Sequence, residues 1–191
     1  MKEGAVRGRH VTIDAPTADD HAWIFNALQR RDIHVPLGAR RPPTLDEHVH
    51  SIFETHRGDE VKAEFVRYHV LRDNSHGRPT GFFVDFGWDH ANDVVREIDL
   101  AFPSTADRNV GVYFDATVIV AQYLFMNRLA KRVRWRVRSH SDRAPRRHER
   151  HGARLIKQQQ ERHPETGEWV TTFIFELAEA DFQRLAAMER R

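Results

Sequence analysis

Two acidic residues near the middle of the chain are spaced for proton transfer. Glu97 and Asp99 alternate with apolar residues in the segment VVREIDLAF, residues 94–102. Alternate side chains of a strand point to the same face, so these carboxylates lie about 7 Å apart on one face. Two carboxylates that close resist being ionised together, which suits a base that acts directly or through water. The alternative is structural, with each carboxylate paired to an arginine of a facing strand or helix.

A second group of residues could hold a phosphate-bearing cofactor. The loop Arg108-Asn-Val-Gly-Val-Tyr113 follows the acidic segment and leads into the apolar run 112–130. This run is too long for one strand and predicts a mostly buried helix. A strand that leads through a loop into a helix presents free N–H groups and the positive end of the helix dipole to an anion. Asn109 tolerates positive φ, and Gly111 allows close approach of the backbone.

Other kinds of catalytic site find less support in the sequence. The chain has no cysteine, which excludes disulfides, a thiol nucleophile and cysteine-ligated zinc. His148 and His151 are three residues apart with no third ligand evident, so we expect no metal site and place them on the surface of an arginine-rich helix. No segment is long and uncharged enough to span a bilayer. With 40% hydrophobic residues, we expect a globular cytoplasmic protein.

Basic residues are concentrated in one segment, although the net charge of the chain is only +2. Residues 131–157 hold eleven Lys or Arg against two acidic residues, which leaves 11 − 2 = +9 over this segment. Within it, 132–138 alternates strictly, with four arginines on one face and Val133, Trp135 and Val137 on the other. The arginines form a solvated face, a counter-charge for cofactor phosphates, or a contact for an acidic partner. We do not expect nucleic-acid binding, because no exposed aromatic residues are interleaved with them.

The remaining elements follow from periodicity and from helix-start and turn signals. Thr17 is the expected N-cap of a helix that runs to Leu28, and 44–47 is a capping-box signature for a second helix toward His56. The prolines and glycine of 32–43 predict a loop. We expect strands at 9–15, 64–72, 80–88, 94–102, 132–138, 153–160 and 168–177. Further helices are expected at 112–130, 142–151 and 179–188, the second ending at Gly152.

This order, βααβββ-loop-αβαββ, resembles that of the GNAT acyltransferase superfamily over nearly the whole chain. The phosphate loop of that family reads Arg/Gln-x-x-Gly-x-Gly/Ala; Arg108 and Gly111 match it, whereas Tyr113 replaces the last small residue. Local stretches resemble the ribosomal-protein N-terminal acetyltransferase branch, among them Gly81 and the pattern Glu149, Arg150, Gly152. The resemblance implies an α/β (α+β) fold with a mixed, mostly antiparallel sheet of about seven strands flanked by helices. It also implies one domain over residues 1–191.

The resemblance further implies an N-acyltransferase that uses acetyl-CoA or another acyl-CoA. The cofactor would lie on the backbone of Leu100, Ala101 and Phe102, and its phosphates on the loop and first helical turn, residues Arg108, Asn109, Val110, Gly111, Val112 and Tyr113. Glu97 or Asp99 would be the base. Ser141 would reach the leaving sulfur or would cap the helix at 142.

The partners follow from the same comparison. The acceptor is an amine of a small molecule or a protein N-terminus, and the arginines of 31–43 at the acceptor entrance suit an acidic one. An acidic partner could bind residues 131–157, and the sequence is compatible with a homodimer. The alternative function is a GNAT-fold binding or scaffold module without ordinary acetyl transfer, or one with a different acyl donor. In that reading Tyr113 blocks the cofactor cleft; otherwise it packs in the first turn of the helix.

Overall fold

Eight strands form one sheet in the computed structural model, which describes residues 6–37, 44–47, 65–90, 93–104, 110–127, 129–139, 148–149, 152–162 and 167–188. The strand order is β1-β2-β3-β4-β5-β6-β8-β7. Only β5 and β6 pair in parallel; the other neighbours are antiparallel. The strands are β1 (Val6–Arg7), β2 (Val11–Asp14), β3 (Phe65–Asp73), β4 (Pro79–His90), β5 (Asp93–Ala101), β6 (Arg132–Ser139), β7 (Arg154–Arg162) and β8 (Trp169–Ala178).

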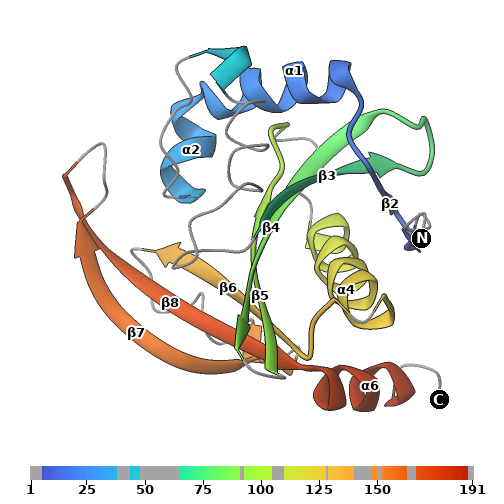
Figure 1. The fold of residues 1–191 in the computed structure, drawn as a ribbon, viewed down its shortest axis with the longest axis vertical. Coiled ribbons are helices and arrows are strands. Elements are labelled where there is room, and N and C mark those ends of the chain that lie inside the picture. Colours follow the sequence, from blue (N-terminus) through green and yellow to red (C-terminus); the bar gives the residue numbers. More distant parts are fainter. Residues whose placement is uncertain are drawn as a thin grey trace.

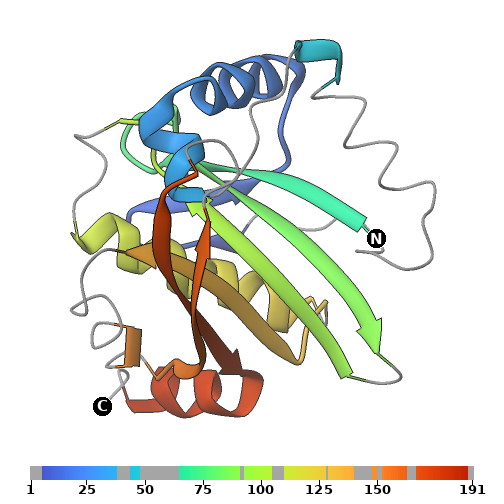
Figure 2. The same cartoon turned by 90° about the vertical axis from the view of Figure 1, so that its left-hand side faces the viewer.

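Helices cover both faces of this sheet (Figure 1). They are α1 (Ala18–Leu28), α2 (Arg31–Leu37), α4 (Val110–Met126) and α6 (Glu179–Met188). Figure 2 shows α1 and α2 at one end of the molecule and α6 at the opposite end. Among the described helices none is long and apolar enough to cross a membrane.

Two apolar clusters hold these layers together, one on each face of the sheet. On one face, residues of α4 such as Ala116 and Leu124 pack on Leu71, Phe83 and Trp135. On the other face, α1 and α2 contribute Ile24, Leu28 and Ile33, which pack on Phe82 and Val84. Adjacent residues of one strand therefore enter different clusters, as Phe82 and Phe83 do, because side chains alternate along a strand.

Three predicted elements differ from those observed. The first strand, expected at 9–15, is confined to Val11–Asp14 and pairs with the unpredicted β1. Within the predicted loop 32–43, residues up to Leu37 belong to the helix α2. The helical conformation is favoured because it buries Ile33 and His34. Pro36 stands in the last turn of this short helix and donates no backbone hydrogen bond there. The central helix starts at Val110 and ends at Met126 rather than spanning 112–130.

The other expected strands and the helices at 17–28 and 179–188 are confirmed within one to three residues, and so are several caps. Most of the helix expected at 142–151 lies outside the described residues. Thr17 caps α1 in a capping box with Asp20. Gly152 has a φ of 78° and donates its N–H to the Glu149 carbonyl, as the residue after a helix does. Thr44 Oγ1 accepts the N–H of Glu47, while 48–56 lie outside the described residues.

Asp115 fastens the start of the sheet to α4. Its carboxylate accepts the backbone N–H groups of Arg9 (3.0 Å), His10 (2.6 Å) and Val11 (3.2 Å). A Cβ on Gly8 would lie 2.5 Å from Ile119 Cγ2, so the turn before β2 approaches the helix as closely as a glycine permits. The orientation of α4, and hence of its N-terminus, therefore depends on this turn.

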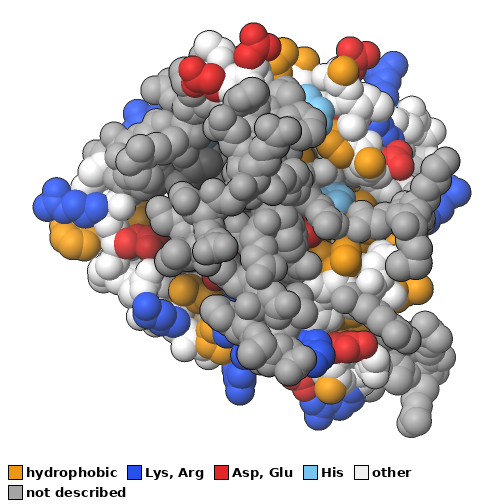
Figure 3. All heavy atoms as spheres, in the orientation of Figure 1, with side chains coloured by type: hydrophobic (Ala, Val, Ile, Leu, Met, Phe, Trp, Pro, Cys, Tyr) orange, Lys and Arg blue, Asp and Glu red, His pale blue; other side chains and the backbone are white. Residues whose placement is uncertain are grey.

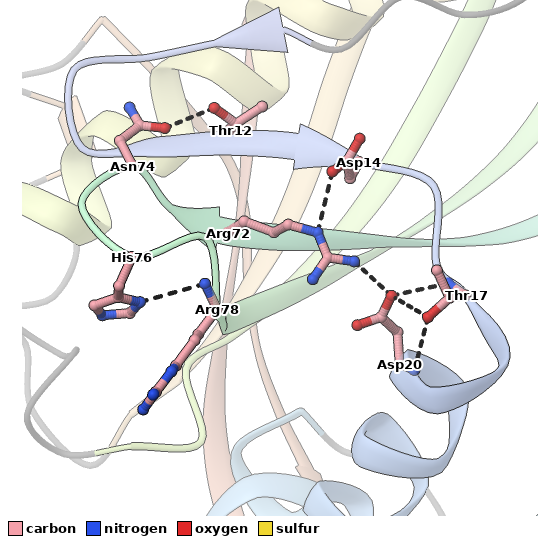
Figure 4. A network of polar contacts seen from close by, with 8 residues as sticks. All are labelled: Thr12, Asp14, Thr17, Asp20, Arg72, Asn74, His76 and Arg78. Atoms are coloured by element: carbon pink, nitrogen blue, oxygen red, sulfur yellow. Dashed lines mark hydrogen bonds and ion pairs between the residues drawn. The ribbon is translucent and has the colours of Figure 1, made fainter.

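A polar network joins β2, α1 and β3 (Figure 4). The Arg72 guanidinium donates to Asp14 Oδ2 at 3.0 Å and to Asp20 Oδ2 at 2.6 Å. Asp20 Oδ2 also accepts the N–H and the hydroxyl of Thr17. Burial alone would raise the pKa of Asp20, but the hydrogen bonds from Thr17 and Arg72 outweigh it and lower the pKa below 3.8. Asp20 thus links α1 to the sheet through its bond to Arg72, and it does so as a charged carboxylate.

Asp20→Asn is expected to lower the free energy of unfolding at pH 7 by about 2 kcal/mol, because the hydrogen bonds to its charge are lost. Since the pKa of Asp20 is lower in the folded protein, its contribution is complete above pH 4 and is lost as the pH falls through the folded-state value. Urea unfolding at pH 7 and pH 3 measures the loss of stability and its dependence on pH. The exposed neighbour is the control: Asp19→Asn should change little, and an equal loss would contradict the role of Asp20.

Candidate functional site

The parallel ladder between β5 and β6 ends before either strand does. Its Cα partners run from Val95 and Arg132 to Ile98 and Trp135. Beyond that point β5 stays paired to β4 as far as Ala101, and β6 stays paired to β8 as far as Ser139. Each strand follows its own half of the sheet, and Figure 1 shows β5 and β6 diverging, with α2 above their ends. Backbone groups of residues 99–101 and 136–139 therefore leave the β5–β6 ladder and become available to a ligand.

The next helix along the chain after β5 is α4, which begins at Val110. Gly111, expected in a loop, lies in the first turn of the helix. Free N–H groups and the helix dipole at that end suit an anion. Gly81 lets the end of β5 pack closely on β4. A Cβ at this position would lie 2.9 Å from both the Ala101 carbonyl oxygen and the Phe102 ring.

The two predicted carboxylates share a face of β5, and their surroundings differ. Glu97 Oε2 accepts from Arg136 Nη2 of β6 at 3.2 Å, so the structural alternative holds for this residue. Asp99 lies two residues further on, past the end of the ladder. There its charge acts on Tyr68 of β3: burial, then Asp99, raises the pKa of Tyr68 to about 12. Asp99 therefore lies on the part of β5 that no longer pairs with β6.

Two aromatic residues near Asp99 were missed in the sequence. Tyr68 is partly buried against the cluster beneath α1. His21 of α1 meets it edge to face, with ring centroids 6.5 Å apart. Burial lowers the pKa of His21, while the charge of Asp20 opposes the shift. The alternation of the segment FVRYHV could have placed Tyr68 on this face, but its pairing with β4 and β5 could not be known.

The arginines of β6 are partly neutralised within the chain. Arg134 Nε donates to Glu176 Oε2 of β8 at 2.8 Å, Arg132 lies 3.3 Å from the same oxygen, and Arg154 of β7 lies 2.9 Å from Oε1. Burial would raise the pKa of Glu176, but hydrogen bonds from Arg134 and Arg154 and the charges of Arg134 and Arg132 lower it. Figure 3 shows Asp and Glu side chains over α1 and Lys and Arg side chains along the margin over β7 and β8.

His148, expected on the surface, is partly buried by aromatic neighbours. Its Nδ1 lies 3.3 Å from Nε1 of Trp135, and its ring centroid lies 4.8 Å from that of Phe175. Trp135 is 9% exposed, so its expected core position is confirmed. The part of the chain that the structure describes holds no group of three or more His, Cys, Asp or Glu placed for a metal ion.

Several predicted site residues cannot be placed. Arg108, Asn109 and Ser141 lie outside the described residues, and so do the side chains of Val110 and Tyr113. Leu100, Ala101 and Phe102 lie on or directly after the diverging end of β5, and Val112 is 9% exposed in the first turns of α4. Of the predicted site residues, the structure thus places Asp99, Leu100 and Ala101 together on the end of β5 that diverges from β6.

No family model and no curated protein sequence matches this chain, whereas solved structures do. Spermidine N-acetyltransferase from Vibrio cholerae, solved with CoA and spermine, superposes with a TM-score of 0.74 at 14% identity, over 91% of this chain and 98% of that one. A GCN5-related N-acetyltransferase from Brucella melitensis gives 0.68 at 19% identity, over 97% and 83%. Aminoglycoside acetyltransferase AAC(6')-Ib, solved with coenzyme A, gives 0.65 at 20% identity, over 91% and 98%. The chain therefore has the fold of the GCN5-related N-acetyltransferases, as the order of its elements predicts.

Proposed function

We propose that residues 1–191 form a single-domain, cytoplasmic N-acyltransferase that moves an acetyl or related acyl group from a CoA thioester to an amine. The observation that carries this proposal is the end of the β5–β6 ladder at Ile98 and Trp135. The helix α4, with Gly111 in its first turn, follows β5 in the chain. The solved structures that share the fold and contain CoA support it. The likeness to the ribosomal-protein branch, read from the sequence, makes a protein N-terminus one candidate acceptor.

The residues at this end of β5 fit an acyl-CoA. Backbone N–H and C=O groups of Leu100, Ala101 and Phe102 can hydrogen-bond the amide groups of the pantetheine arm. The first turn of α4, with Gly111 inside it, can hold the pyrophosphate, and Arg108 and Asn109 directly precede that turn. The basic residues of 131–157 are then a source of further counter-charge.

In the proposed reaction, Asp99 accepts a proton from the acceptor ammonium, directly or through water. The neutral amine attacks the thioester carbonyl, so that a C–N bond forms and the C–S bond breaks. The CoA thiolate leaves and takes a proton from Ser141, the donor proposed from the sequence. Ser141 regains a proton from the nitrogen that becomes the amide. The products are the amide and CoA, with all atoms balanced. Glu97, bonded to Arg136, then orients the arginine beside the base.

Calorimetry with CoA and acetyl-CoA tests the cofactor. We expect binding that Gly111→Trp abolishes, because the bulky side chain stands in the helix turn proposed for the pyrophosphate. Met126→Trp is the control: it places the same side chain at the far end of α4, where Met126 is 68% exposed, and should leave affinity unchanged. Absence of binding at millimolar ligand in the unmodified protein would contradict the proposal.

The second candidate, a binding module without ordinary acetyl transfer, rests on Tyr113 in place of a small residue. A gain of CoA affinity in Tyr113→Gly would favour it. Unchanged affinity in this variant would favour the acyltransferase.

A further inference from the structure

The strand β7 forms one edge of the sheet. Within the part of the chain that the structure describes, it pairs with β8 and with no other strand, and it lies at the margin of the molecule (Figure 1). All nine of its residues are exposed or half-buried. The strand at the opposite edge, β1, has two residues. Since an edge strand directs backbone N–H and C=O groups away from its sheet, β7 is the edge long enough to accept another strand.

A bulge separates the start of β7 from its regular part. The register with β8 shifts between Leu155 and Lys157, and it is regular from Lys157 to Arg162. Side chains alternate along this regular part. The odd-numbered residues therefore share the face of Thr172, which is opposite Gln159, and the even-numbered residues point to the other face.

The odd-numbered face of β7 is complementary to itself. Lys157 and Glu161 lie two residues before and two residues after Gln159. If two copies of β7 pair antiparallel with Gln159 opposite Gln159, each Lys157 lies opposite the Glu161 of the other copy. The Glu161 carboxylate is held on this face by Thr172 Oγ1 at 2.6 Å and Gln159 Nε2 at 3.1 Å, and a carboxylate can accept further bonds. One two-fold axis at Gln159 therefore creates two ion pairs.

The same register brings exposed apolar side chains together on the even-numbered face. Ile156 is 37% exposed and Trp169 is 60% exposed, two of the four exposed large hydrophobic side chains among the described residues. Within one copy Trp169 is opposite Arg162, whose guanidinium carbon lies 5.0 Å from the centre of the Trp169 ring. With Gln159 on the axis, Ile156 of one copy lies beside this pair of the other copy. Association thus removes apolar surface of both copies from water.

Neighbouring registers lose this match. With Gln158 on the axis, Arg154 of each copy lies opposite Arg162 of the other, and like charges in that position repel. With Gln160 on the axis, Glu161 lies opposite Gln159 and has no cation across from it. The charges of β7 therefore favour one register of self-pairing.

We propose that β7 pairs antiparallel with β7 of a second copy of the chain, about a two-fold axis at Gln159, so that two sheets join into one. Lys157 and the bulge disfavour an unrelated strand at this edge, whereas a second β7 offers Lys157 an opposite charge. This interface does not depend on the proposed acyl transfer, and neither do its tests.

The register is tested by cross-linking, since the chain has no cysteine of its own. Opposite residues of antiparallel strands have Cα atoms about 4.5 to 5.5 Å apart, which a disulfide can bridge. Gln159→Cys is therefore expected to form a covalent dimer on mild oxidation, seen on a non-reducing gel. Gln158→Cys is the matched control, because its two copies would lie about 8 Å apart, beyond the reach of a disulfide. Absence of the dimer in Gln159→Cys, or formation as fast in Gln158→Cys, would overturn the proposal.

The charge pairs are tested by sedimentation velocity over a concentration series, with circular dichroism to check that each variant is folded. Lys157→Glu alone and Glu161→Lys alone should each weaken self-association about tenfold or more, because like charges then lie opposite each other. An equimolar mixture of the two variants should restore it, since each supplies the charge that the other lacks.

Arg78→Glu is the control for charge reversal, because it changes an exposed residue in the turn between β3 and β4 and should leave association unchanged. A monomeric unmodified protein at about 0.1 mM would overturn the proposal. So would association that Lys157→Glu leaves unchanged, or a mixture that associates no better than its two components.

Discussion

Asp99→Asn is expected to lower kcat about 10²- to 10⁴-fold while CoA affinity stays within a factor of two to three, the range lost when a general base is removed. The loss is expected because of the position of Asp99 on β5. Asp99 lies just beyond the last β5–β6 pair, where a ligand can replace the missing strand partner. Stopped-flow or steady-state consumption of acetyl-CoA, with an amine acceptor that the unmodified protein acylates, measures the loss of kcat.

Glu97→Gln is the matched comparison, since it removes the neighbouring carboxylate of the same strand face. Its smaller expected loss reflects the bond to Arg136 at 3.2 Å, which engages Glu97 within the protein. A larger loss in Glu97→Gln than in Asp99→Asn would reverse the two roles.

Glu176→Ala is expected to have the largest effect on stability, lowering the free energy of unfolding by about 3 kcal/mol. The side chain is 4% exposed and is the described counter-charge of Arg132, Arg134 and Arg154, which come from β6 and β7. Its removal leaves three guanidinium groups on one sheet face without that partner. Guanidinium chloride or urea unfolding, followed by circular dichroism, gives the difference.

Arg154→Ala provides the control within the same cluster. Its side chain is 74% exposed, so water replaces much of what the ion pair provides, and we expect a loss below about 1 kcal/mol. Equal losses in Arg154→Ala and Glu176→Ala would show that Glu176 contributes as an ordinary surface partner and not as the buried centre of the cluster. Because the pKa of Glu176 is lowered in the folded protein, its contribution is expected above about pH 4.5 and fades as the pH falls through the folded-state value.

Short-range patterns in the sequence were sufficient wherever the structure depends on neighbouring residues. The strict alternation of 132–138 predicted β6 with Trp135 on its buried face, and both are observed. The caps at Thr17 and Gly152 were also readable, because a cap bonds groups three or four residues away. The order of such elements was enough to predict the fold, because it resembles the order in the GNAT superfamily.

What the sequence left open depends on distant partners. The segment 32–43 reads as a loop because of its prolines and glycine, and only the burial of Ile33 and His34 makes its first part a helix. Glu97 and Asp99 look equivalent along the chain. They differ because the β5–β6 ladder ends between them and Arg136 donates to Glu97.

The sequence by itself determined the element order and the strand faces, since periodicity and capping are local properties of the chain. The mixed direction of the sheet followed from the resemblance of that order to the GNAT superfamily. The tertiary structure decided which carboxylate pairs with Arg136 and which one raises the pKa of Tyr68. It also showed how far β5 and β6 run together. These features arise from the register between strands that are far apart in the sequence, as β5 and β6 are, and no local pattern encodes that register.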